Sequence, residues 1–158
     1  MFDHKRVLVA LDGSMSSEAM LRFVLEIAAP LDMTVLLLRV VEPLTPMIGD
    51  DIYRPTLDDI EARRRDAEDY LAPIAGALRA RGVHTAWEVR RGRPEEQILA
   101  AAEESGVDMI AMATHGRTGL GRLLFGSVAE GVLRRASVPV FMMRQPDGVP
   151  ATPGVTAR

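Results

Sequence analysis

Two kinds of hydrophobic segment alternate along the chain. Some segments are short, continuously apolar and rich in β-branched residues, whereas others are longer and place apolar residues at helical spacing. Regular alternation of the two kinds is typical of strand–helix–strand units around a parallel sheet. The pattern therefore predicts an α/β fold. The expected strands cover residues 6–11, 34–41, 84–90, 109–113 and 138–143.

Turn and capping residues mark the ends of the helices expected between these strands. Asp12-Gly13-Ser14 supplies a turn with capping residues ahead of the first helix. Thr56 to Asp59 resembles a capping box and Gly82 is a natural C-cap, so a long second helix is expected between them. Pro94 suits the first position of the third helix, which ends at Gly106.

Three further features bear on the helices and their connections. Pro73 lies inside the second helix and should kink it or locally break it. The fourth helix begins near Ser127, and Ser127 with Glu130 matches a capping box. Residues 43–55 are rich in proline and have a length typical of a mobile flap or a binding loop.

The apolar stripe of each expected helix predicts the face that covers the sheet. Apolar residues three and four positions apart lie on one side of a helix, and we expect that side to be buried. The expected inward positions are Ala19, Met20, Phe23, Val24, Ile27 and Leu31; Ile60, Arg64, Ala67, Leu71, Ile74 and Leu78; Ile98, Leu99 and Ala102; and Val128, Val132 and Leu133.

Parallel strands joined by right-handed crossovers allow few topologies. The chief one is a doubly wound sheet in a three-layer α/β/α arrangement, and we expect the strand order 3-2-1-4-5. Such sheets bind ligands beyond the carboxyl ends of the strands, where the strand order reverses. The first and fourth strands are the expected switch pair. Function is therefore expected at residues 12–14 and at the glycine-rich stretch 113–127.

The last expected strand should lie at an edge of the sheet, because Pro139 cannot donate a backbone hydrogen bond to a neighbour. An edge strand exposes unpaired backbone groups that a second copy would cover, so a homodimer through Val138 to Met143 is expected. The domain is expected to span residues 1–144. Residues 145–158 contain three prolines and two glycines and are expected to form a disordered tail.

Composition narrows the classes of function. The chain has 158 residues, a formal net charge of -3 and 4% aromatic residues, which argues against a nucleic-acid binder or an anionic membrane partner. It has no cysteine, which excludes thiolate chemistry, and with three scattered histidines no metal site is expected. No apolar run approaches the ~20 residues of a membrane span, and no signal peptide is recognised, so a soluble cytoplasmic protein is expected.

The strongest candidate for chemistry is the glycine-rich stretch. Its glycines let the backbone approach an anion, and Gly126-Ser127 opens a helix whose free N–H groups favour negative charge. Arg117 and Arg122 add positive potential. We interpret the stretch as a phosphate cradle, although it matches neither the P-loop nor the Rossmann fingerprint. The alternative is a flexible loop whose glycines only permit tight turns.

The same stretch resembles the signature of the universal stress protein family. His115-Gly116, nine residues and then Gly126-Ser127-Val128-Ala129-Glu130 match it, and Val138-Pro139-Val140 follows. The opening VLVALDGSMSSEAM resembles the family's first strand and turn, and LLLRVVEP its second strand. The resemblance implies a Rossmann-like fold similar to that of the adenine nucleotide alpha-hydrolases. It also implies a stress-response protein that binds ATP with Mg²⁺ and dimerises through its last strand.

ATP-binding members of that family carry glycine, two residues, glycine, nine residues, and glycine followed by serine or threonine. Gly116 and Gly126 match the second and third glycines, but Ala113 stands at the first position. Alanine keeps its backbone donor in place if φ is negative, but not if φ must be positive. By resemblance, Ala10, Leu11 and Asp12 would line the adenine and ribose side, and Val40 would pack against the base. Met112 and Ala113 would border the sugar. The residues that would meet the phosphates are His115, Gly116, Gly126, Ser127 and Val128, and Arg117 adds positive charge nearby.

Several of these residues also have a simpler explanation. Asp12 fits a turn residue or a helix cap, and Ser127 fits a cap that competes with phosphate for the same N–H groups. His115 fits an exposed loop residue, and the arginines of the stretch fit solubilising charges. Arg63 to Arg65 lie in a helix rich in acidic residues and are expected to form a solvated face.

No catalytic set is recognised in the sequence. Asp12, Ser14, Ser16 and His115 contain the groups of a triad, but nothing orders them as nucleophile, base and orienting group. The leading hypothesis is an ATP-binding, nucleotide-responsive stress regulator. The alternatives are a dimeric interaction module without nucleotide, which Ala113 favours, and a slow ATP hydrolase or autophosphorylating protein.

Overall fold

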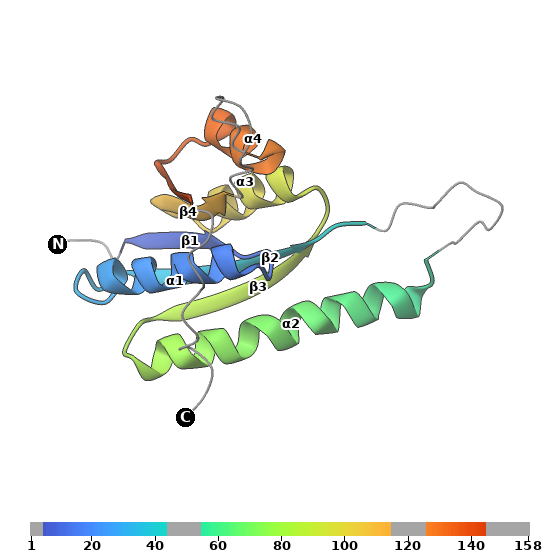
Figure 1. Ribbon diagram of the computed structural model, residues 1–158, viewed down its shortest axis with the longest axis horizontal. Coiled ribbons are helices and arrows are strands. Elements are labelled where there is room, and N and C mark those ends of the chain that lie inside the picture. The colour runs from blue at the N-terminus through green and yellow to red at the C-terminus, as the bar shows by residue number, and fades with distance from the viewer. Residues whose placement is uncertain (1–4, 44–54, 115–125, 145–158) are drawn as a thin grey trace.

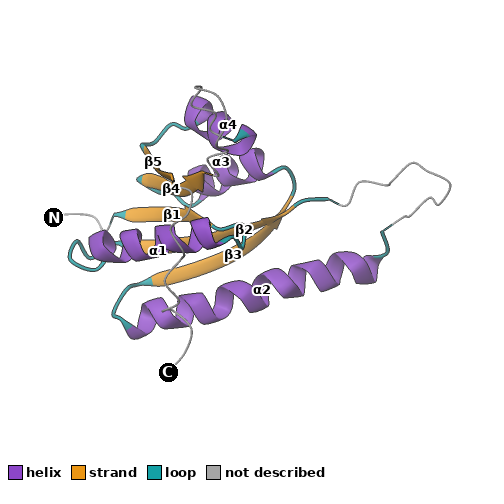
Figure 2. Ribbon diagram, in the orientation of Figure 1, coloured by secondary structure: helices purple, strands orange, loops and turns teal. Residues whose placement is uncertain are grey.

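Strands and helices alternate along the chain in the computed structural model, which describes residues 5–43, 55–114 and 126–144 (Figures 1 and 2). Each element that the hydrophobic pattern predicts is present. The elements are β1 Arg6–Ala10, α1 Met15–Ala28, β2 Thr34–Val41, α2 Leu57–Ala80, β3 Thr85–Arg91, α3 Pro94–Glu104, β4 Met109–Thr114, α4 Ser127–Arg135 and β5 Val140–Arg144.

The strands form a parallel sheet in the order β3-β2-β1-β4-β5, as predicted. β1 lies in the middle and pairs with β2 on one side and β4 on the other. The chain first runs outward through β2 to β3 and then crosses back to β4 and β5. The direction of winding therefore reverses at β1 and β4, which confirms the doubly wound topology and its switch pair.

Helices cover both faces of the sheet, so the fold has three layers. Val7 and Val9 of β1 face α1 and α2 in one hydrophobic cluster, whereas Leu8 faces α3 and α4 in the other. All three side chains are fully buried. A strand covered on both faces has no polar side, which explains why apolar residues follow one another in this segment.

Capping chemistry sets the predicted starts of the first three helices. The Ser14 side chain accepts a hydrogen bond from the Ser17 N–H at 3.2 Å. Thr56 and Asp59 form the predicted capping box, in which each side chain accepts from the backbone N–H of the other. Pro94 occupies the first turn of α3, where its missing N–H would have no helical partner.

α2 runs without interruption from Leu57 to Ala80, although Pro73 lies inside it. Of the two expected effects, the local break is therefore wrong, and the kink stays a prediction. Pro73 and Asp69, whose carbonyl loses its helical partner to the proline, are both exposed. Because water can satisfy that carbonyl, the helix tolerates the proline.

The buried helix faces differ from the expected stripes at several positions. Phe23 is 45% exposed, Leu133 is 47% exposed, and Leu31 lies beyond the end of α1 and is 63% exposed. Arg64 is exposed as well. A small side chain lets a helix approach the sheet closely, and spacing alone does not report that distance. Alanines fill the contacts instead: Ala28, Ala75, Ala101 and Ala129.

β5 is an edge strand, as predicted, but it begins at Val140 rather than at residue 138. Pro139 has no N–H to donate to a ladder. Its carbonyl nevertheless accepts a hydrogen bond from the Ile110 N–H at 3.0 Å. Pro139 therefore aligns β5 beside β4 without itself joining the strand.

The other predictions about chain organisation concern segments outside the described residues. These segments are most of the 43–55 loop and the expected tail, residues 145–158. The domain limits of 1–144 stay a prediction. In the described ranges, no helix is both long enough and apolar enough to cross a membrane.

Replacing Leu71 with alanine should lower the free energy of unfolding by about 2–5 kcal/mol. Leu71 is fully buried between α2 and the sheet, so its removal leaves a cavity. Leu57 of the same helix is 84% exposed, and Leu57→Ala is the matched control, with an expected change within about 0.5 kcal/mol. Urea unfolding measures both changes. Equal losses in the two variants would contradict the inward face assigned to α2.

Candidate functional site

A cleft opens at the carboxyl ends of β1, β2 and β4, where the strand order reverses. Its volume is about 860 Å³, which lies in the range of small-molecule sites. The start of α4 borders it beside β4, and α2 borders it beside β2. Ser17 of α1 and Pro94 and Ile98 of α3 also contribute to the lining. We call it the switch-point cleft.

Every predicted site residue within the described ranges lines this cleft. They come from three strand ends and one helix start that are distant in the sequence. His115, Gly116 and Arg117 lie outside the described residues. The predicted residues in the cleft are Ala10, Leu11, Asp12, Val40, Met112, Ala113, Gly126, Ser127 and Val128.

The turn between β1 and α1 holds Asp12 at the cleft. Asp12 Oδ1 accepts a hydrogen bond from the Ser14 N–H at 2.9 Å. Gly13 has a φ of +82°, a left-handed conformation that favours glycine. Asp12 therefore stabilises the turn, as one interpretation of the sequence predicted, and it also lines the cleft.

α4 reaches the cleft without a side-chain cap. Gly126 is the N-cap, and no described side chain accepts a hydrogen bond from the first-turn N–H groups. The expected capping box is wrong, because Ser127 is the first helical residue and lies one position too late to cap. Glu130 pairs with Arg134 at 2.7 Å instead. The first-turn N–H groups and the positive end of the helix dipole therefore lie at the cleft.

Neither Ala113 nor Gly126 is in a strained conformation. Ala113 continues β4 and pairs with Met143 of β5. Among the described residues other than glycine, a positive φ occurs at Asp32 alone, so Ala113 keeps its backbone donor in the strand direction. A Cβ built on Gly126 would meet nothing within 4 Å. The fold itself therefore does not require glycine at position 126.

Arg39 is a cleft residue that the sequence analysis did not single out. Its charge interrupts the apolar run of β2, a signal by which it could have been found. Its guanidinium carbon lies 5.2 Å from the centre of the Tyr70 ring, a cation–π distance. A Cβ on Gly13 would lie 2.5 Å from Nη1 of Arg39. Arg39 therefore packs directly against the β1–α1 turn.

Tyr70 of α2 connects Arg39 to α1. Its hydroxyl donates a hydrogen bond to Oε1 of Glu18 at 3.2 Å. Burial, followed by the negative charge of Glu18 and its hydrogen bond, raises the pKa of Tyr70 to about 12. The hydroxyl therefore remains a donor throughout the physiological pH range.

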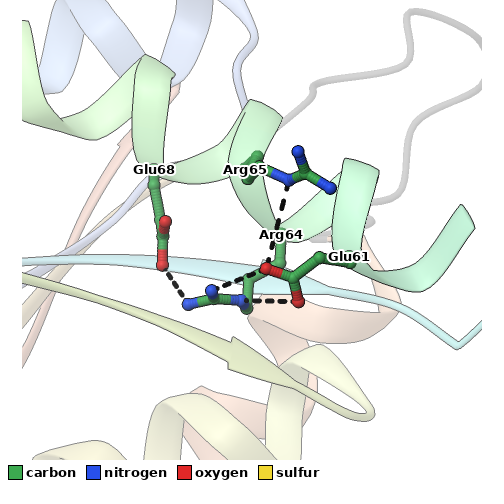
Figure 3. Close-up of polar contacts among 4 residues, drawn as sticks. All are labelled: Glu61, Arg64, Arg65 and Glu68. Carbon is green, nitrogen blue, oxygen red and sulfur yellow. Dashed lines mark hydrogen bonds and ion pairs between the residues drawn. The ribbon is translucent and has the colours of Figure 1, made fainter. Parts of the chain in front are cut away.

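The arginine run of α2 is divided between two environments. Arg63, Arg64 and Arg65 are all exposed, which confirms the predicted solvated face. Arg64 and Arg65 pair with acidic residues of the same helix (Figure 3). Arg63 lines the cleft together with Asp66, and its Nη1 donates to the Glu42 carbonyl at 3.1 Å. Consecutive helical residues point in directions about 100° apart, a periodicity that could have separated Arg63 from its neighbours.

The described charges of the cleft are unevenly placed. Asp12, Glu42 and Asp66 are acidic, whereas Arg39 and Arg63 are basic, and all five lie at β1, β2 and α2. The α4 side offers backbone N–H groups and a positive dipole end. This arrangement suits a ligand with an anionic group at one end and hydrogen-bond donors at the other. The described residues contain no cluster of three side chains that could hold a metal ion.

Comparison with known proteins identifies the family. The family model described as the universal stress protein family matches residues 3–144. The chain belongs to the universal stress protein family. A universal stress protein of Methanocaldococcus jannaschii is 30% identical over 143 residues, which make up 90% of this chain and 84% of that protein.

Solved structures of universal stress proteins share the fold. One from Burkholderia pseudomallei is 30% identical with a TM-score of 0.69, and the match covers 89% of this chain and 96% of that one. One from Archaeoglobus fulgidus, in complex with dAMP, is 23% identical with a TM-score of 0.61 over 90% of this chain and 98% of that one. The latter is a likeness of fold.

Tyr70 should make stability fall more steeply above pH 10. Its pKa is about 12 in the folded chain, against an ordinary value of 10.0, so folding favours the protonated hydroxyl. That contribution is fully present below pH 10 and is lost as the pH rises through about 12. Above pH 10 the free energy of unfolding should therefore fall less in Tyr70→Phe than in the wild type. Because solvent screens the half-exposed ring, we expect this difference to be about 1 kcal/mol. Urea unfolding across this pH range tests it, and parallel declines in the two proteins would contradict it.

Proposed function

We propose that this universal stress protein binds ATP and acts as a nucleotide-responsive regulator in a stress response. The observation that carries the proposal is the switch-point cleft, at which α4 presents an N-terminus without a side-chain cap among the described residues. Helix N-termini of this kind favour phosphate groups. The dAMP complex of the Archaeoglobus fulgidus protein supports an adenine nucleotide as the class of ligand.

The order of the strands supports one direction for the nucleotide. The start of α4 lies beside β4, β1 comes next, and β2 follows. Neighbouring strands are about 4.8 Å apart, so the ends of β4 and β2 are separated by about 10 Å. We place the phosphates at residues 126–128, the sugar between residues 10–12 and 112–113, and the base at Val40. Residues 115–117, outside the described ranges, would complete the phosphate site.

Ala113 is compatible with this placement. Its regular strand conformation keeps the backbone N–H in the direction that a glycine with negative φ would give. The remaining difference from the family motif is one methyl group at the border of the cleft. A change of that size alters the fit of the sugar but removes no hydrogen-bond donor.

Mg²⁺ would enter the site with the nucleotide. Mg²⁺ usually keeps several water ligands and is held by one or two carboxylates together with substrate phosphates. An ion carried mainly by phosphate oxygens needs no dedicated cluster of protein ligands. Its role would be to neutralise phosphate charge beside the start of α4.

The regulatory part of the proposal is a shift of population. Bound ATP would stabilise one arrangement of the glycine-rich stretch and of the 43–55 segment, and a protein partner would recognise that arrangement. The nucleotide would shift the equilibrium by as much as its affinities for the two arrangements differ.

A homodimer through β5 is the second part of the proposal. The outer edge of β5 pairs with no described strand. Phe141 of β5 stacks on Phe23 of α1 with ring centres 5.4 Å apart, and Phe23 is 45% exposed. The edge therefore combines unpaired backbone groups with an apolar border, which a second copy would cover.

Gly126→Val should abolish the binding of Mg-ATP. Gly126 lines the cleft where the phosphates would lie, so a valine side chain there would compete with them, while a Cβ at this position meets no described atom within 4 Å. Gly76→Val is the control, because Gly76 lies in α2 away from the cleft and also has open space around it. Calorimetric titration measures the affinity, and hydrogen exchange of residues 113–127 should slow on ATP addition in the wild type and the control only. Equal binding by both variants would contradict the phosphate site.

The protein should have twice the chain mass of 17.3 kDa at micromolar concentration. Light scattering measures this mass directly. Phe23→Arg adds charge to the apolar border and should shift the equilibrium toward the monomer. A monomeric mass for the wild type would refute the dimer.

A further inference from the structure

The first turns of α2 form a free-standing wall of the cleft. No described residue of this helix before Ala67 is buried, and its N-terminal end projects beyond the sheet (Figure 1). A helix segment without buried residues gains little from packing. Its polar residues are therefore candidates for a role in the cleft.

This segment has two polar faces with different surroundings. At about 100° per residue, positions 61, 64, 65 and 68 share one face, and positions 63, 66, 67 and 70 share the opposite one. On the first face the two glutamates and two arginines pair with one another (Figure 3). On the opposite face Ala67 is buried and Tyr70 is half-buried, whereas Arg63 and Asp66 are exposed and border the cleft.

Arg63 and Asp66 are the charged residues of that opposite face. Both line the cleft, and neither forms an ion pair with a residue in the described part of the chain. The bond from Nη1 of Arg63 to the Glu42 carbonyl holds the guanidinium over the end of β2. Arg63 retains further N–H donors and Asp66 its acceptor oxygens. α2 thus presents a donor and an acceptor close together at the β2 end of the cleft.

We propose that Arg63 and Asp66 read the base of the bound nucleotide as a 6-aminopurine, an inference that rests on the proposed ATP binding. With the phosphates at α4, the nucleotide crosses β4 and β1 and brings its base to β2 and α2. A 6-aminopurine carries an amino donor beside a ring-nitrogen acceptor. Asp66 accepts from the amino group, and Arg63 donates to the ring nitrogen. A hydrogen bond to a carboxylate is charge-assisted and stronger than a neutral one.

The test is a double-mutant cycle between Asp66 and the amino group. Two ligands are compared: Mg-ATP, and Mg-purine riboside triphosphate, which lacks only the amino group. Each is titrated calorimetrically into the wild type and into Asp66→Ala. Loss of the amino group should weaken binding about tenfold in the wild type but less than about twofold in the variant, because the variant has already lost the acceptor. Alanine suits an exposed helical position, so the fold is retained.

Asp69→Ala is the matched control. Asp69 is an exposed aspartate of the same helix that lies outside the cleft lining, and its variant should respond to the amino group as the wild type does. Arg63→Ala should weaken both triphosphates because both keep the ring nitrogen, whereas Arg65→Ala should weaken neither.

The outcomes separate the two proposals. If the wild type binds ATP and Asp66→Ala is as sensitive to the amino group as the wild type, base reading by Asp66 is overturned while ATP binding stands. If Asp69→Ala loses the discrimination too, a general charge effect replaces the proposed contact. If the wild type binds neither triphosphate, ATP binding fails and base reading fails with it.

Discussion

β1 occupies the centre of the sheet, and a hydrophobic layer covers each of its faces. Val7 and Val9 lie against α1 and α2, and Leu8 lies against α3 and α4. Two helical layers can cover both faces only if the chain winds outward from β1 in one direction and later in the other. The connections diverge beyond the ends of β1 and β4, and the switch-point cleft is the space between them. The burial of one strand therefore determines where a ligand can bind.

The helix starts differ according to their place around this cleft. α1 and α2 are capped by their own side chains, Ser14 and Thr56. α3 and α4, whose first residues line the cleft, have no side-chain cap among the described residues. An uncapped start leaves backbone N–H groups without a partner, which costs some stability but provides donors for an anion. Departures of this kind from local rules are expected at functional sites.

α2 serves both as a cover of the sheet and as a wall of the cleft. Its later turns bury Leu71 and Leu78 against the sheet. Its early turns pair their outward charges with one another and turn Arg63 and Asp66 to the cleft. Tyr70 lies between the two parts, where it contacts Arg39 of β2 and Glu18 of α1. A displacement of α2 would therefore alter the core and the cleft wall together.

Local patterns in the sequence were sufficient for the elements and for much of the site. Hydrophobic period distinguished strands from helices, Thr56 and Asp59 located the start of α2, and Pro139 indicated the edge position of β5. Because the carboxyl ends of parallel strands share one edge, Asp12 and the start of α4 were expected together at the cleft. Val40 and Met112, which also line it, were expected there from the family resemblance.

Tertiary structure decided the remaining features. The spacing of apolar residues gives the width of the apolar face of a helix, but it gives neither the rotation of the helix nor its distance from the sheet. Phe23 was therefore expected to be buried, and the buried Ala28 was overlooked. Arg39, Arg63 and Asp66 enter the cleft because of where β2 ends and how far α2 projects beyond it. By itself, the sequence determined the elements, their order in the sheet and the edge where the site lies. Which side chains meet at that edge depends on the relative placement of elements, which no local pattern encodes.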